Sequence, residues 1–258
     1  MGIEGSNYII RSVDHALRIL EQFLEDDDEI GITEFSRRLN LHKNKIFRLL
    51  ATLQSRNYVE QGKFPGSYRL GLKNLQLGQN FIHQMGLLRQ ARGVLESLVR
   101  KCDETSNVAI LKGFEIIYLG AVESDLPVRV IPRVGTRLPF HCTAAGKVLA
   151  AGINGENLSK YIRAGRLKRY TPNTISDPDE LTRQLRSVSE LGYAVDDEEL
   201  DLGVRCIGAP IRDYMGQVIG AVSVSGPSTR INADRIHQEL IPLVKEAAEE
   251  ISSRLGYH

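Results

Sequence analysis

LHKNKIFRLLATL, residues 41–53, decides how the first quarter of this chain folds. Its large apolar residues recur at i, i+3, i+4 and i+7, which places one apolar stripe along a helix: Ile46, Leu49, Leu50 and Leu53. The opposite side carries Asn44, Arg48 and Ala51, while Lys45 lies on a flank and Lys43 in the first turn. In the major groove Asn can pair with adenine and Arg with guanine, and Lys contacts phosphate. An amphipathic helix with a solvated basic face would share this pattern, so the neighbouring segments must decide.

Helical patterns also precede this segment. An apolar stripe over residues 13–24 ends in the acidic run 25–29, and a short pattern follows over residues 32–39. Thr33 is placed to cap the start of that second helix. A tight turn at residues 40–42 then leads into the basic helix. Two short helices joined in this way predict a helix-turn-helix, whose second helix reads bases.

Residues 58–70 alternate like strands on both sides of a turn at 62–66 that contains Pro65. We expect a two-stranded wing, with Lys63 at its tip and Arg69 on its return strand. The candidate DNA-contacting residues of the helix and wing are Lys43, Asn44, Lys45, Phe47, Arg48, Thr52, Lys63 and Arg69.

Charge is strongly polarised within this region. Residues 37–69 contain eight Lys or Arg against one acid, a net charge of +7. Residues 1–36 contain two Arg against nine acids, a net charge of −7, although the whole chain carries only +1. DNA affinity depends on where cations cluster, because each phosphate contact releases counterions locally. We therefore predict that residues 1–71 form a winged helix-turn-helix domain that binds double-stranded operator DNA.

Composition bounds the remaining chain. The 258 residues leave room for one larger domain, and a hydrophobic content of 42% with 25% charged residues is typical of soluble globular proteins. No apolar run approaches the roughly 20 residues needed to span a bilayer, and the N-terminus lacks a signal-peptide pattern, so no membrane partner is expected. Cys102, Cys142 and Cys206 show no metal-like or redox-like spacing. We expect reduced thiols, a cytoplasmic location, no metal and no cofactor.

Residues 72–86 have a helical pattern with apolar residues that a lone connector could not bury, so we interpret them as a linker helix that pairs two protomers. Residues 87–258 mix helices with strands. Strands are expected at 108–111, 116–119, 128–131, 193–195, 206–211 and 218–224, and helices at 144–151, 180–191 and 233–255. The predicted fold class is α+β: a winged helix-turn-helix, a linker helix and an α/β sensor domain.

Three segments of this second domain suit a polar small-molecule pocket. Thr143 is a good N-cap, so helix N–H groups after it could hold a carboxylate. Asp196 ends a strand, and Ser223 and Ser225 share one face of another, although both serines could simply satisfy a sheet face. Lys147 is expected to be solvated or structural and Cys206 to be inert core. A solvated acidic loop is expected at Asp197, Glu198, Glu199 and Asp201.

Several motifs in order resemble those of IclR-type transcriptional regulators, from about Arg11 to the C-terminus. They are RSVDHALRIL (11–20), LHKNKIFRLLATL (41–53), YRLG (68–71), LPFHCTAAGKVLA (138–150), GYAVDDEELDLGVRCIGAPI (192–211) and VIGAVSVSGP (218–227). Members often have a Ser or Thr pair after the Lys of the recognition helix, where this chain has Asn44 and Lys45. The operator sequences of family members are therefore not assigned to this protein.

This resemblance implies a GAF-like effector domain and a dimer or tetramer. It also implies a small-molecule effector, often an organic acid or an aromatic compound. It places effector contacts at Ala144, Ala145, Asp196, Val204, Cys206, Ser223 and Ser225. The leading expectation is a ligand-responsive repressor or activator of a metabolic or catabolic operon. The alternative is a metal- or thiol-redox-responsive regulator that uses His141, Cys142 and Cys206. An enzyme is not expected, because no Ser-His-Asp or phosphate-loop pattern is present.

Overall fold

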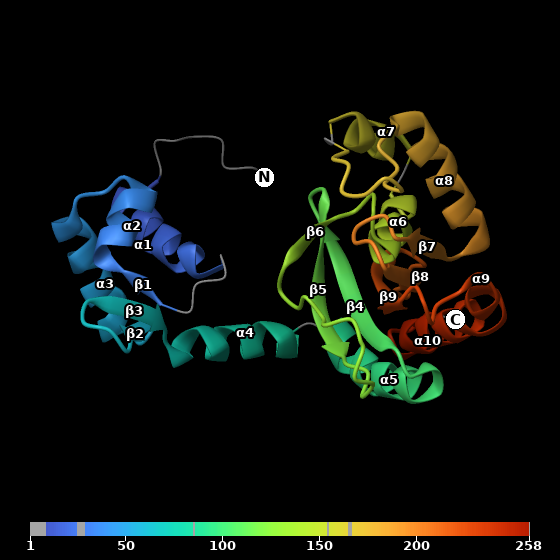
Figure 1. Cartoon of the computed structure of the whole chain (residues 1–258), viewed down its shortest axis with the longest axis horizontal. Helices are drawn as coiled ribbons and strands as arrows, with labels where there is room; N and C mark the ends of the chain where they lie inside the picture. The colour runs from blue at the N-terminus through green and yellow to red at the C-terminus, as the bar shows by residue number, and fades with distance from the viewer. Residues whose placement is uncertain (1–8, 25–28, 85, 154, 165–166, 258) are drawn as a thin grey trace. The chain divides into compact units, whose positions relative to one another are not determined.

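The structure, a computed structural model, describes residues 9–24, 29–84, 86–153, 155–164 and 167–257. The chain divides into two compact units, residues 1–84 and 85–258. Both units appear in Figure 1, coloured from blue in the first to red at the end of the second. No described helix is both long and apolar enough to cross a membrane.

The first unit is a winged helix-turn-helix, as predicted. Its helices are α1 (Arg11–Glu21), α2 (Ile32–Leu39) and α3 (Lys43–Ser55), and η2 (Gln22–Leu24) is a 3₁₀ turn. A three-stranded antiparallel sheet of order β1-β3-β2 completes it, with β1 (Ile30–Gly31), β2 (Val59–Gln61) and β3 (Ser67–Leu70). Ile19, Phe35, Ile46 and Leu50 are fully buried at its centre. Removing these apolar surfaces from water is the main force that holds the helices on the sheet.

Three local expectations for this unit were wrong. In α1 it is Ile19 that is buried, whereas Val13 and Leu17 of the expected stripe are more than half exposed. Strand β1 was not foreseen, and it changes the start of α2. The helix begins directly after β1, so Gly31 is its N-cap and Thr33 lies inside the first turn rather than capping it. The Ile32 N–H instead donates to the Gly66 carbonyl of the wing.

The turn between α2 and α3 combines a backbone conformation with a side-chain cap. Asn40 ends α2 in the left-handed conformation, with φ of 51°, which Asn tolerates better than most residues. His42 then caps α3, because its Nδ1 accepts a hydrogen bond from the Asn44 N–H at 3.3 Å. Together they end α2 and start α3 within three residues.

Helix α4 (Leu72–Gln84) follows the wing without a break. The Asn74 side-chain amide donates to the carbonyls of Tyr58 and Gly71, at 2.6 and 2.9 Å. These hydrogen bonds attach the start of α4 to the end of the DNA-binding fold.

The second unit is built on a six-stranded antiparallel sheet of order β6-β5-β4-β9-β8-β7. The strands are β4 (Thr105–Lys112), β5 (Glu115–Val122), β6 (Arg137–Pro139), β7 (Ala194–Asp197), β8 (Val204–Arg212) and β9 (Val218–Pro227). Helices α5 (Gly86–Cys102) and α10 (Ile241–Arg254) pack on one face through an apolar core that includes Val108 and Val224. Helix α6 (Ala144–Ala151) packs on the other face, against Ala109 and Ala221. The remaining helices are α7 (Gly155–Ala164), α8 (Pro178–Leu191) and α9 (Ala233–Arg235).

Two expectations for this unit were wrong. Residues 128–131 form no strand; they belong to an irregular connection, residues 123–136, that we call the strap. At residues 128–130 its backbone is bound by side chains, since Thr105 donates to the Val130 carbonyl and Arg230 to that of Val128. Further along, the Gly135 N–H donates to the Tyr118 carbonyl of β5 at 2.9 Å. The expected single C-terminal helix is interrupted by a π-helical turn, η3 (Ile236–Leu240), just before Pro242 in α10. Helix α7 was not predicted.

Candidate functional site

Helix α3 separates its residues as a DNA-reading helix requires. Ile46, Leu50 and Leu53 are buried against the rest of the unit. All six helix residues predicted to contact DNA are exposed: Lys43, Asn44, Lys45, Phe47, Arg48 and Thr52. A buried back holds the helix in place, so its polar face can enter a groove without moving the core.

The wing tip is shaped by the last residue of the acidic run. Both carboxylate oxygens of Glu29 accept from the Lys63 N–H, at 2.8 and 2.9 Å, and the Ser67 hydroxyl donates to Glu29 at 2.7 Å. These hydrogen bonds hold the pKa of Glu29 below its usual range. Lys63 is exposed at the tip as predicted, whereas Arg69 forms an ion pair with Glu60 of the opposite strand at 2.8 Å. Arg69 would have to exchange this partner for a phosphate.

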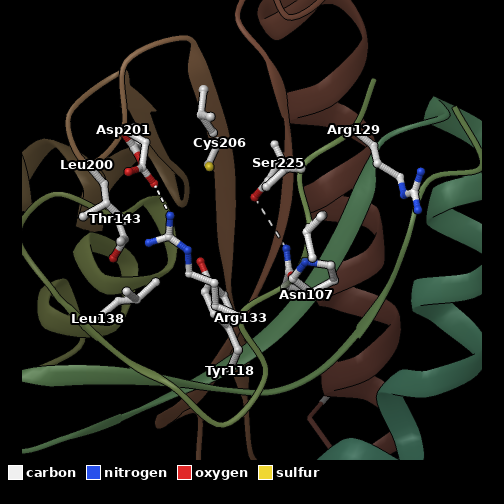
Figure 2. A pocket seen from close by; sticks show the side chains of 15 residues that line it. Asn107, Tyr118, Arg129, Arg133, Leu138, Thr143, Leu200, Asp201, Cys206 and Ser225 are labelled. Carbon is white, nitrogen blue, oxygen red and sulfur yellow. Dashed lines mark hydrogen bonds and ion pairs between the residues drawn. The ribbon is translucent and has the colours of Figure 1, made fainter. Parts of the chain in front are cut away.

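The second unit contains a cavity of about 460 Å³ on the α6 face of its sheet (Figure 2). Such a volume suits a small metabolite. Its wall comes from the strap, from all six strands of the sheet and from the loops at their ends. The lining residues are Asn107, Tyr118, Arg129, Val130, Ile131, Pro132, Arg133, Leu138, Thr143, Asp196, Leu200, Asp201, Val204, Cys206 and Ser225.

Four of the seven expected effector residues line this cavity: Asp196, Val204, Cys206 and Ser225. Ala144, Ala145 and Ser223 do not reach its surface and are at most 1% exposed. The reason is close packing of α6 on β8. A Cβ at Gly208 would lie 3.1 Å from backbone atoms of Ala144 and Ala145, so the first turn of the helix rests directly on the strand.

Thr143 lies at the junction between α6 and the cavity. Its hydroxyl caps the helix by accepting from the Gly146 N–H at 3.2 Å, and the residue lines the cavity. The backbone N–H groups of the first turn carry the positive end of the helix dipole. This end of the cavity therefore favours an anionic group such as a carboxylate.

Asp196 faces the same end and is 3% exposed. Burial raises its pKa to about 7, while the Glu199 N–H, which donates to Oδ1 at 2.8 Å, and the charge of Lys147 oppose that rise. At neutral pH the carboxyl is therefore neutral for a large share of the time. In that form it can donate a hydrogen bond to an anionic ligand instead of repelling it.

A buried ion pair lies close to Asp196, and here one expectation was wrong. Lys147, expected to be solvated or structural, is structural: it is fully buried, and its Nζ donates to the Val195 carbonyl and to Glu199, each at 2.5 Å. Glu199 is only 4% exposed, so the acidic loop is not uniformly solvated. The loop turns Glu199 inward toward Lys147. The other acids of the loop stay at least partly exposed and form ion pairs with arginines. Arg205 pairs with Asp197 and Glu198, and Arg133 pairs with Asp201.

Several cavity residues escaped prediction. Asn107 could have been found from the alternation of β4, which turns Val108 toward α5 and α10 and therefore Asn107 toward the cavity. Tyr118 follows from the same alternation on β5. The strap residues, Arg129 and Arg133 included, carry no periodic signal, and only the folded structure brings them over the sheet.

The metal- or redox-responsive alternative gains no support from the described residues. Burial raises the pKa of Cys102 to about 11 and that of Cys142 to about 12, and it also raises the pKa of Cys206. Thiols of this kind react slowly because the thiolate is the nucleophile. His141 Nε2 is engaged 3.0 Å from the Lys168 carbonyl. The described part of the chain holds no group of three or more His, Cys, Asp or Glu that could bind a metal ion.

Comparisons with known proteins cover both units. Residues 12–63 match the IclR helix-turn-helix domain, and residues 79–253 match the C-terminal domain of bacterial IclR transcriptional regulators. The chain is 34% identical to the regulator XynR of Escherichia coli, over 96% of this chain and 98% of XynR. It is 36% identical to the regulator KdgR of Dickeya chrysanthemi, over 96% and 81%.

Solved structures agree with this assignment. IclR of Thermotoga maritima superposes with a TM-score of 0.81 at 29% identity, over 96% of this chain and 99% of that one. An IclR homologue from Microbacterium hydrocarbonoxydans, solved with 4-hydroxybenzoate, gives a TM-score of 0.83 at 26% identity, over 95% and 98%. The chain belongs to the IclR family of bacterial transcriptional regulators, which bind DNA in response to small ligands.

Proposed function

We propose that this protein binds the operator of a metabolic or catabolic operon and alters that binding when a small organic acid or aromatic metabolite enters the cavity of the second unit. The carrying observation is the cavity itself, where a helix N-terminus and the near-neutral Asp196 face one end of a space of about 460 Å³. The structure of the Microbacterium homologue in complex with 4-hydroxybenzoate supports a small organic acid as the ligand of this cavity. We assign DNA binding to residues 1–71, linkage to 72–86 and effector binding to 87–258.

The DNA contacts are divided between α3 and the wing. Arg48 and Asn44 read base edges, Phe47 contacts a thymine methyl group, and Lys63 at the wing tip contacts phosphate. Lys43, Lys45, Thr52 and Arg69 complete the DNA surface.

The effector's carboxylate lies at the N-terminus of α6, where Ala144 and Ala145 contribute backbone N–H groups rather than side chains. Val204 and Cys206 form the apolar wall, and Ser225 offers a hydroxyl. Ser223 supports this wall from beneath. Binding shifts the equilibrium between arrangements of two paired protomers, because the effector binds one arrangement more tightly than the other.

A gel-shift titration with the full-length protein tests this proposal. Operator release, or gain of binding, is measured against concentration for a panel of organic and aromatic acids, with thermal-shift measurements alongside. An effector should raise the melting temperature with the logarithm of its concentration. A panel in which every acid leaves both operator binding and melting unchanged would contradict the assigned cavity.

The affinity for a carboxylate effector should fall as pH rises through about 7. Asp196 has a raised pKa, so it is protonated below that pH and ionised above it, where its charge repels the ligand's carboxylate. The same shift makes folding stability decline from about the ordinary pKa of Asp toward pH 7, because the unfolded chain ionises first. Calorimetric titration between pH 5.5 and 8.5 measures the effect. Asp196→Asn should bind acids with a flat pH profile, and a sloping profile in that variant would assign the dependence to another group.

The intact protein should be a dimer or tetramer in light scattering at micromolar concentration. Two groups of apolar side chains in the first unit are exposed to solvent in the single chain. One lies on α4 and the other around the start of α1, and each member is at least half exposed: Leu72, Leu75 and Leu77, and Ile10 and Val13. A two-fold partner would bury them and would match a palindromic operator. A monomer under these conditions would contradict the assigned role of α4.

The relatives are named as regulators, and we propose no catalytic role for this chain. Since chromosomal DNA is the proposed partner, we propose that the protein acts in the cytoplasm.

A further inference from the structure

Asn107 lies on the opposite side of the cavity from Thr143 and the start of α6 (Figure 2). A polar row crosses the sheet, because Asp196 of β7 pairs with Cys206 of β8, which in turn pairs with Ser225 of β9. Strand β4 comes next and carries Asn107.

The Asn107 side chain lacks one of its partners. Its Nδ2 donates to the Ser225 hydroxyl at 3.5 Å, which is a long hydrogen bond. Asn107 is only 3% exposed. Its Oδ1 is buried as well, and it accepts no hydrogen bond from any described residue. A buried acceptor without a donor is costly, so this atom favours a ligand that supplies one.

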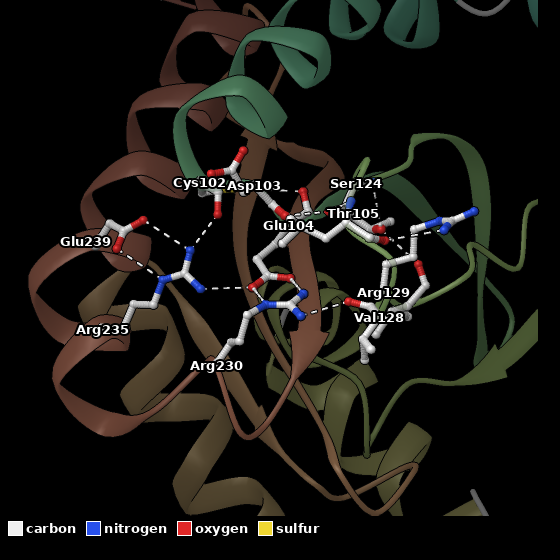
Figure 3. A network of polar contacts seen from close by, with 12 residues as sticks. Cys102, Asp103, Glu104, Thr105, Ser124, Val128, Arg129, Arg230, Arg235 and Glu239 are labelled. Atoms are coloured by element: carbon white, nitrogen blue, oxygen red, sulfur yellow. Dashed lines mark hydrogen bonds and ion pairs between the residues drawn. The ribbon is translucent and has the colours of Figure 1, made fainter.

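Strap residues 129–133 line the cavity, and side chains from distant segments bind the backbone of the strap (Figure 3). The Thr105 hydroxyl donates to the Val130 carbonyl at 2.8 Å. Arg230 donates to the Val128 carbonyl at 2.8 Å. It also donates two hydrogen bonds to the fully buried carboxylate of Glu104, at 2.6 and 2.8 Å. Val130 and Ile131 of this strap line the cavity and add apolar side chains to the surroundings of Asn107. An unmet hydrogen bond counts for more in such surroundings than in water.

We propose that the effector is a hydroxy acid that spans the cavity, with its carboxylate at the α6 end and a hydroxyl at the opposite end donating to Asn107 Oδ1. Asn107 is then the residue that selects hydroxylated over plain acids. This inference rests on the proposed effector site and narrows its ligand class. An acid of two or three carbons would fill the α6 end and leave Asn107 unsatisfied.

Two matched pairs of probes test the selection: 4-hydroxybenzoate against benzoate, and 6-hydroxyhexanoate against hexanoate. Each pair differs by one hydroxyl at the end opposite the carboxylate, and the two pairs separate aromatic from aliphatic ligands. Calorimetric titration of the full-length protein should give at least about tenfold tighter binding of the hydroxylated member in one pair, as expected for a site with a buried partner for that group.

The variants isolate Asn107. Asn107→Leu keeps the side-chain volume and removes the acceptor, so it should bind both members of the selected pair within about threefold of each other. Asn107→Asp keeps acceptor oxygens and should retain the preference, which covers the case in which the Leu variant fails to fold. Asn173→Leu, an exposed position whose amide contacts the Asp197 carbonyl outside the cavity, is the matched control and should retain the full preference.

The outcomes separate this inference from the function on which it rests. Equal binding of hydroxylated and plain acids by the wild type would overturn the role of Asn107 and leave the acid site standing. An unchanged preference in Asn107→Leu would do the same. Failure of all four acids to bind would overturn the proposed acid site together with this inference.

Discussion

Arg48→Ala should bind the operator about tenfold to a hundredfold more weakly than wild type and should tolerate base changes at one operator position. An Arg that donates two hydrogen bonds to guanine contributes roughly 1–3 kcal/mol of discrimination, and about 1.4 kcal/mol corresponds to a factor of ten. Arg48 is exposed on α3, so its loss leaves the buried side of the helix intact. Gel-shift titrations against the operator and its single-position variants measure both effects.

Lys63→Ala is the matched control for this prediction. Lys63 lies at the wing tip, where its side chain is exposed and its backbone is held by Glu29. The variant should weaken binding to all sequences about equally and reduce the salt dependence of log K by about one unit. If Arg48→Ala instead behaved like Lys63→Ala, with unchanged base preferences, Arg48 would be a phosphate contact and α3 would read bases through other residues.

The DNA-binding unit was largely predictable because its signals are local. The i, i+3, i+4, i+7 spacing of Ile46, Leu50 and their neighbours fixed the buried side of α3, and that alone determined which residues are exposed. The errors have a different origin. Strand β1 is two residues long and exists because the wing pairs with it, and the Glu29 contact with Lys63 joins residues 34 positions apart. No local pattern encodes contacts of this kind.

Only those residues of the candidate effector site that lie on strands could be predicted from the sequence. Asp196, Cys206 and Ser225, which the family resemblance suggested as effector contacts, line the cavity, and alternation along β7, β8 and β9 explains why these side chains face α6. The strap was missed, because its apolar residues near Val128 suggest a strand while side chains from distant segments hold its backbone. Glu199 was misjudged for a related reason. Charged residues are normally exposed, and only the fold shows that Glu199 and Lys147 are buried together.

Lys147→Met should lower the free energy of unfolding by about 3–5 kcal/mol. The substitution keeps a long side chain in the interior but leaves Glu199 buried without its counter-charge, which is the costly half of breaking a buried ion pair. The Val195 carbonyl also loses its donor. Urea denaturation followed by circular dichroism measures the change. An ion pair of the surface, Arg254 with Glu250, offers a control, and Arg254→Met should cost no more than about 1 kcal/mol.

The double variant Lys147→Met with Glu199→Leu separates the cost of an unpaired charge from the value of the pair. With both charges removed, neither position leaves an unpaired charge in the interior, and apolar side chains of similar size occupy the same space. Replacing a buried pair in this way is often neutral or stabilising, so the double variant should recover most of the stability that the single variant lost. It should also change the pKa of Asp196, because Lys147 and Glu199 act on that carboxyl with opposite signs. A double variant no more stable than Lys147→Met would show that Lys147 acts mainly through the Val195 carbonyl and the packing of α6.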